Sequence, residues 1–222
     1  MLSACVVYEV KTGVDVDALY EKLTSGFSHD TTGDYVDTLI TDVENVQRTE
    51  RGVEFVCRYD IEETRPVRES EDPWFPALHK VTVRVTDQYF ILNSYDSKNK
   101  AASHVSTVLD ISPDEYEQVE FSSALLISVV AEDAAELSQG TWEDPTEHAD
   151  TATIWGQLQD SALYAEFNTD GRASWARFES ATKPGHEAGL STNKDSVVFG
   201  TGWELPEMED YICNQIIPNA TD

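Results

Sequence analysis

Hydrophobic and polar positions alternate along several stretches of the chain, and this pattern is typical of strands that bury one face. The strictest alternation lies in residues 53–61, where five apolar side chains face one way and charged ones the other. Further strands are predicted at residues 4–10, 35–46, 81–85, 89–92, 151–157, 163–167, 173–178 and 197–199. Turns at 50–52 and 87–88 are expected to join the first-half strands into two hairpins. The chain should therefore be rich in antiparallel sheet.

Helical spacing of apolar residues appears in fewer places. It predicts a helix that starts after Asp15 or Asp17 and ends at Gly26, a second over 98–109 and a third over 208–217. The apolar run 121–130 and the acidic, Ala-rich stretch 131–137 are interpreted as a strand followed by a short helix. One buried helix across both is the alternative, because periodicity does not separate short apolar strands from helices. Residues 168–171 are interpreted as a hairpin turn.

The order of the predicted elements begins again after Ser112. Each half has a strand, a helix, an antiparallel meander and a closing helix. We therefore expect an α+β protein with two tandem domains, residues 1–112 and 113–222, each with its helices packed on one face of a sheet.

Composition adds a strong charge bias to this picture. The 222 residues include 42 Asp and Glu against 15 Lys and Arg, which gives a formal net charge of -27. Such an acidic composition resembles that of salt-in halophiles, chiefly haloarchaea, where concentrated salt screens self-repulsion. The expected location is a high-salt cytoplasm, or a larger particle assembled there. The sequence lacks an apolar run long enough for a membrane span, and its three cysteines have no CxxC spacing.

Basic residues are unevenly distributed. Residues 101–171 contain no Lys or Arg and 15 acidic residues, whereas arginines cluster around the first predicted hairpin. The arginines and two tryptophans in predicted loops form the candidate partner-contact set: Arg48, Arg51, Arg58, Arg65, Arg68, Trp74 and Trp142. One interpretation is that the arginines pair with nearby glutamates and the loop tryptophans fold back on the core. The other is a contact surface for the acidic half of another copy. Trp155 and Trp175, in predicted strands, are expected in the core.

Motifs that carry chemistry are weak. Glu9 and Lys11 resemble the ExK element of PD-ExK nucleases and of CYTH-type triphosphate tunnel enzymes, but the further acidic and basic residues those families need are missing. Gly200 and Gly202 lack the third glycine of a dinucleotide loop. Acidic loops around His29, His148 and His186 suit loosely bound cations at most. We therefore expect no catalytic residue, no cofactor and no dedicated metal site.

These observations favour a non-catalytic, salt-adapted structural or assembly protein whose partners are further copies of itself or other protein subunits. One alternative is a nucleic-acid-binding saddle, since the tandem element order resembles the TATA-binding protein fold. That resemblance covers element order alone, and the net charge opposes binding to a polyanion. The other alternative is a helix-grip module in which a curved sheet binds a small molecule.

Overall fold

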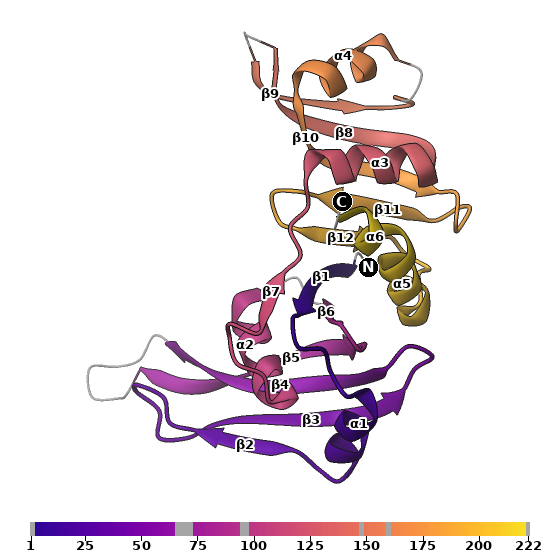
Figure 1. Cartoon of the computed structure of the whole chain (residues 1–222). Coiled ribbons are helices and arrows are strands. Elements are labelled where there is room, and N and C mark those ends of the chain that lie inside the picture. The colour runs from indigo at the N-terminus through magenta and orange to yellow at the C-terminus, as the bar shows by residue number, and fades with distance from the viewer. Residues whose placement is uncertain (1–2, 65–72, 94–97, 147–148, 159–160, 221–222) are drawn as a thin grey trace. The chain divides into compact units, whose positions relative to one another are not determined.

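The computed structural model describes residues 3–64, 73–93, 98–146, 149–158 and 161–220 (Figure 1). The strands are β1 Ser3–Val10, β2 Ser28–Thr31, β3 Leu39–Arg48, β4 Val53–Thr64, β5 Trp74–Val85, β6 Tyr89–Asn93, β7 Tyr116–Gln118, β8 Ala134–Thr146, β9 Ala149–Trp155, β10 Arg172–Ser180, β11 Glu187–Ser191 and β12 Ser196–Phe199. The helices are α1 Val16–Thr24, α2 Lys98–Leu109, α3 Ser123–Asp133, α4 Ala162–Asp170, α5 Leu205–Tyr211 and α6 Ile217–Ala220, and a π-helical turn, Ile212–Ile216, joins the last two.

The described strands belong to one large antiparallel sheet in the order β2-β3-β4-β5-β6-β1-β12-β11-β10-β8-β9, with β7 paired to β1 off this path. The predicted fold of two tandem strand-helix-meander-helix domains is therefore wrong. The reason lies in β1, which pairs with β12 so that Ser3 is opposite Phe199. Pairing between strands so far apart in the sequence cannot be recognised from the order of elements alone.

By contact density the chain forms two compact units. The N-terminal unit is Tyr8–Glu117, and the C-terminal unit combines Met1–Val7 with Gln118–Asp222. They differ from the ranges 1–112 and 113–222 in that the first residues of the chain belong with the C-terminal half. Within the described residues, no helix is long and apolar enough to cross a membrane.

In the N-terminal unit, α1 and α2 cover one face of the sheet. The face they cover carries the alternating residues predicted from the sequence, Val53, Phe55, Cys57 and Tyr59, each at most 2% exposed. The α2 side chain His104 stacks on Tyr59 with ring centroids 4.5 Å apart. Lys22 of α1 donates to the carbonyl of Val108 at the end of α2, 2.9 Å away, which ties the two helices together. Both hairpins predicted in this unit are confirmed, as β3–β4 and β5–β6.

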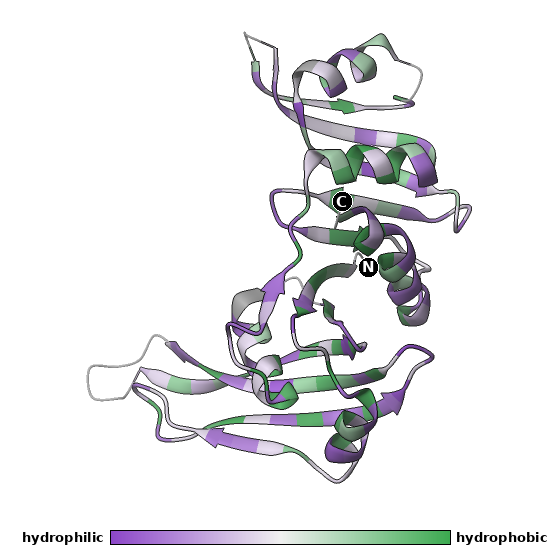
Figure 2. Cartoon of the chain, in the orientation of Figure 1, coloured by the Kyte–Doolittle hydropathy of each residue, from purple (hydrophilic) through white to green (hydrophobic). Residues whose placement is uncertain are grey.

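In the C-terminal unit, α3, α4 and α5 supply the side chains that pack on the sheet. Hydrophobic residues continue along α3 (Figure 2), and four of them, Leu125, Leu126, Val129 and Val130, are buried. Trp142 of β8 packs against Phe167 of α4, with centroids 5.5 Å apart, and Tyr211 of α5 meets Phe199 edge to face. These contacts place the core of this unit on one face of β8 and β10–β12.

Three element predictions in this unit are wrong. Residues 121–130 contain the start of α3 and not a strand, and α3 ends at Asp133, so 131–137 divide between that helix and β8. Residues 163–167 lie in α4, and the expected hairpin turn at 168–171 is the C-terminal end of that helix with Gly171 as its cap. Both helices begin at a serine cap whose hydroxyl accepts a backbone N–H, and that local signal outweighed the short apolar runs.

Candidate protein-interaction surfaces

The face of the N-terminal sheet opposite α1 and α2 combines two of the predicted contact residues. Successive strand residues point to opposite faces, so Arg58 faces away from its covered neighbours Cys57 and Tyr59. Arg58 lies opposite Lys80 on β5. Trp74, predicted in a loop, is instead the first residue of β5, and because it is six residues before Lys80 it lies on the same face. We call this surface the outer face and define it by Tyr35, Ile40, Arg58, Trp74, Leu78 and Lys80.

Apolar side chains on the outer face are exposed to an unusual degree. Leu78 is 53% exposed and Ile40 is 40% exposed. The two flank Asp60, which is opposite Leu78 and whose carboxylate accepts the Ile40 N–H at 3.1 Å. Ile40 and Leu78 therefore lie two strands apart in one row of the sheet, with Asp60 between them, and we call this row of exposed side chains the strip.

An aromatic pair extends the strip. Tyr35, 59% exposed, stacks on Trp74 with ring centroids 4.1 Å apart and planes 5° from parallel. Glu62 holds the loop before β3 in place, because its Oε1 accepts the backbone N–H of Tyr35 at 2.6 Å and of Val36 at 2.7 Å. These two hydrogen bonds from the backbone to Glu62 of β4 therefore hold the Tyr35 end of the stack at the sheet.

A charged ladder borders the strip along the same strands. Arg58 lies 3.5 Å from Asp42 and 3.4 Å from Glu44, and Lys80 donates to Glu44 at 2.7 Å. The hydrogen bond from Lys80, followed by the charges of Lys80 and Arg58, lowers the pKa of Glu44. Farther along, the buried pair Arg84–Glu54 joins β5 to β4. These arginines thus pair within the chain while half of Lys80 stays exposed.

The remaining predicted contact residues lie elsewhere. Arg48 forms an ion pair with Asp17 and lies over the Tyr20 ring of α1, which places it on the covered side of the sheet. Arg51 occupies the β3–β4 turn. Trp142 belongs to β8 and not to a loop, is 2% exposed, and donates its indole N–H to Asn168 at 2.8 Å. Arg65 and Arg68 lie outside the described residues.

Sequence reasoning missed an exposed tryptophan in the C-terminal unit. Trp155, expected in the core, is 70% exposed at the end of β9. It faces the same side as Arg177, because both lie opposite Gln139 of β8. Trp175 is half-buried beside them and leans over Gly189, where an added Cβ would be 2.6 Å from its ring. Residues of this region, Gln139, Trp175, Arg177, Glu187, Ala188, Gly189, Val198 and Gly200, line a hollow of about 90 Å³.

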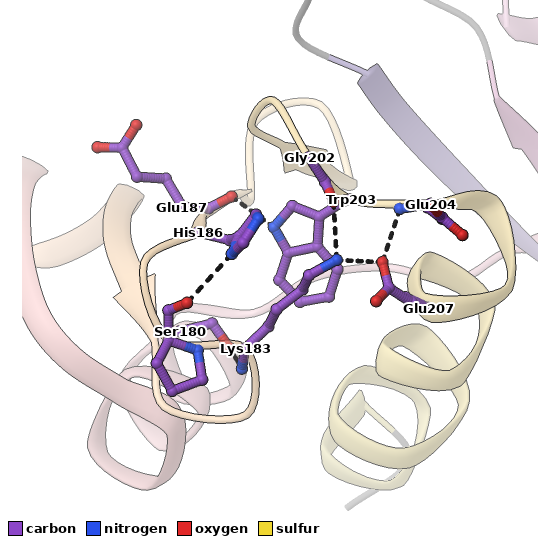
Figure 3. A network of polar contacts seen from close by, with 9 residues as sticks. Ser180, Lys183, His186, Glu187, Gly202, Trp203, Glu204 and Glu207 are labelled. Carbon is purple, nitrogen blue, oxygen red and sulfur yellow. Dashed lines mark hydrogen bonds and ion pairs between the residues drawn. The ribbon is translucent and has the colours of Figure 1, made fainter.

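Two clusters of polar side chains in the C-terminal unit connect its strands to its helices by hydrogen bonds and ion pairs. Figure 3 shows Lys183 beside Trp203, where its ammonium donates to the Gly202 carbonyl at 2.7 Å and pairs with Glu207. The Trp203 N–H donates to the Glu187 carbonyl at 2.9 Å, so the β10–β11 turn is fastened to the start of α5. The hydrogen bond from Lys183 lowers the pKa of Glu207. The ammonium of Lys183 is thus engaged by both a carbonyl and a carboxylate of the segment around Trp203.

The buried carboxylate of Asp133 is the centre of the second cluster. It accepts hydrogen bonds from the Ser180 hydroxyl at 2.7 Å, the Tyr211 hydroxyl at 2.9 Å, and the Thr182 backbone N–H and hydroxyl at 2.8 and 2.5 Å. Burial, then the neighbouring Asp133 charge, raises the pKa of Tyr211. Four donors on one carboxylate connect the ends of α3 and β10 to α5.

Lys11, the lysine of the ExK-like element, makes a local contact at the end of β1. Lys11 lies 3.1 Å from Glu117 in an ion pair exposed to solvent. In the part of the chain that is described, no group of three or more His, Cys, Asp or Glu side chains is arranged to hold a metal ion.

Comparison with known proteins adds no assignment: no protein-family model matches the chain, and no curated protein sequence matches it. The geometry of its surfaces is the remaining basis for a functional argument.

Proposed function

We propose that this chain is a non-catalytic assembly protein that associates with further copies of itself through the outer face. The observation that carries the proposal is the exposed strip of Ile40, Leu78 and the Tyr35–Trp74 stack on a sheet face whose two helices lie on the opposite side. Exposed apolar side chains with polar groups among and around them are typical of protein–protein contacts.

The composition of the strip supports a protein partner. Aromatic residues and arginine are enriched at interfaces, and a stacked Tyr–Trp pair offers a large contact area with few rotatable bonds. The carboxylates beside the strip, Asp42, Glu44 and Asp60, disfavour the phosphate backbone of a nucleic acid. A protein surface can satisfy both the apolar strip and the mixed charges of its border.

The charged border favours another copy of the chain as the partner. Residues 101–171 contain 15 acidic residues and no Lys or Arg. Lys80, half exposed at the edge of the strip, and Arg58 beside it are the cations that such an acidic surface would meet. Their present partners on the same sheet keep them oriented, so little side-chain entropy would be lost on binding.

The test replaces the two exposed aliphatic residues, as Ile40→Ser with Leu78→Ser. The double variant should melt within a few degrees of the wild type, because both residues are exposed and surface substitutions usually change stability little. Light scattering in concentrated KCl should show a heavier species for the wild type than for the variant, since the strip no longer excludes water from the contact. Thr24→Ser, on the exposed side of α1, is the matched control and should keep the wild-type mass. An unchanged mass in the double variant would contradict the proposal.

A further inference from the structure

A second self-association site is indicated at β9, the last strand of the sheet. In the described residues β9 pairs with β8 on one side, and it ends the strand order. None of its seven residues is buried, although they include Ala152, Ile154 and Trp155. Edge strands of stable monomers are commonly blunted by lysine, proline, a bulge or short length. Residues 149–155 contain no Lys or Pro.

The opposite edge of the sheet is different. There β2 has four residues, Ser28–Thr31, and includes His29 and Asp30. A short, polar edge of this kind offers little to another strand. The open edge is therefore β9 and not β2.

The hydrogen bonds to β8 determine which backbone groups of β9 are open. The Gly156 N–H donates to the Ser138 carbonyl at 2.9 Å, and this pair continues the register in which Trp155 is opposite Gln139. Hydrogen-bonded and non-hydrogen-bonded pairs alternate in an antiparallel ladder. Residues 154 and 152 therefore bond to β8, while Thr151, Thr153 and Trp155 direct their N–H and C=O groups away from it.

A side-chain contact supports this register. In non-hydrogen-bonded pairs the side chains approach more closely. Thr153 and Thr141, opposite each other on β9 and β8, have hydroxyl oxygens 3.0 Å apart. The register from 151 to 155 is also continuous, because the irregularity in the pairing lies between Glu143 and Thr146 of β8.

We propose that β9 pairs antiparallel with β9 of a second copy about a two-fold axis at Thr153. This register sets Thr153 opposite the second copy's Thr153, Thr151 opposite the second copy's Trp155, and Trp155 opposite the second copy's Thr151. Each of these three pairs exchanges two backbone hydrogen bonds. On the other face Ala152 meets the second copy's Ile154. The proposal rests on the proposed function only in taking the chain to be self-associating.

The second copy is favoured as occupant because the segment 151–155 is complementary to itself. Every opposed pair in the register is uncharged, and aromatic–β-branched and Thr–Thr pairs are among the favourable cross-strand pairs. Two chains that each carry -27 repel one another over most of their surface. The uncharged segment 151–155, with its open hydrogen-bonding groups, is where they can approach, and pairing would also cover the exposed face of Trp155.

The experiment uses the Ile40→Ser, Leu78→Ser variant, in which the two exposed aliphatic side chains of the outer face are removed. Thr153→Pro removes an outward N–H, and proline is tolerated at edge positions whose N–H faces solvent. Thr153→Val keeps that N–H and the β-branch and is the matched control. Light scattering in concentrated KCl should give twice 24.8 kDa for the parent and the Val variant, and 24.8 kDa for the Pro variant.

The outcomes separate the two proposals. A parent variant that is monomeric, or a Pro variant that stays dimeric, would overturn β9 pairing and leave the outer face untouched. If the Ile40→Ser, Leu78→Ser variant had the full wild-type mass, the role of the outer face would be overturned. Comparison of the masses of the Pro and Val variants would then still test the pairing of β9. Thermal melting of the Pro variant close to that of the Val variant confirms that lost association does not reflect unfolding.

Discussion

Asp133 shows how a single residue can hold several elements of the C-terminal unit. It is 3% exposed and its carboxylate accepts four hydrogen bonds from Ser180, Thr182 and Tyr211. This role cannot be recognised in the sequence, because Asp133 lies in an acidic stretch between Glu132 and Glu136, and nothing in their order distinguishes one carboxylate from another. Trp155 was expected in the core and is 70% exposed. The alternation of residues in a strand indicates which side chains share a face, but not whether another element packs on that face.

We predict that Asp133→Ala lowers the free energy of unfolding by about 3 kcal/mol or more, because it leaves buried hydroxyl groups without their acceptor. Urea denaturation of the variant and the wild type measures the difference. Glu132→Ala, at the exposed neighbouring position, is the control and should change stability by about 0.5 kcal/mol or less. Equal stability of the two variants would show that the Asp133 network is dispensable.

At the scale of elements, strands with strict alternation were predicted well and helices with apolar runs were not. The β3–β4 and β5–β6 hairpins follow from period-two patterns and short turns. In contrast, α3 and α4 are short and apolar on more than one side, so their sequences also suit buried strands. The distinguishing signal was the serine cap, Ser122 or Ser161, one residue before each helix.

The β3–β4 turn allows the packing of a single hairpin against its neighbouring strand to be tested. Gly52 is buried there, and a Cβ at its position would lie 1.8 Å from the Val85 carbonyl oxygen on β5. We predict that Gly52→Ala destabilises the fold by about 2 kcal/mol or more, since the backbone must move to relieve the clash. Denaturant unfolding checks this, with Glu50→Ala in the same turn as the control. A cost below that of the control would mean that the hairpin adjusts freely.

At the scale of the whole molecule, the antiparallel character could be predicted but the strand order could not. Joining β1 to β12 requires contacts across nearly the full length of the chain, and one sequence contains no record of them. The net charge of -27 follows directly from the sequence, and its effect on the stability of the fold is a prediction.

Stability should rise with salt. With 42 acidic and 15 basic residues, repulsion among carboxylates is weakly screened in dilute buffer and strongly screened above about 1 M KCl. Circular dichroism melts in dilute and in concentrated KCl measure the effect, and the melting temperature should increase with KCl concentration. An equal melting temperature in both buffers would contradict the salt-adapted interpretation.

The most direct test of the central claim is the mass of the wild-type chain in solution, measured by light scattering in concentrated KCl over a wide range of protein concentration. Self-association through the outer face predicts a mass above 24.8 kDa that rises with concentration and falls in the Ile40→Ser, Leu78→Ser variant. A wild-type mass that stays at 24.8 kDa at every concentration would contradict it.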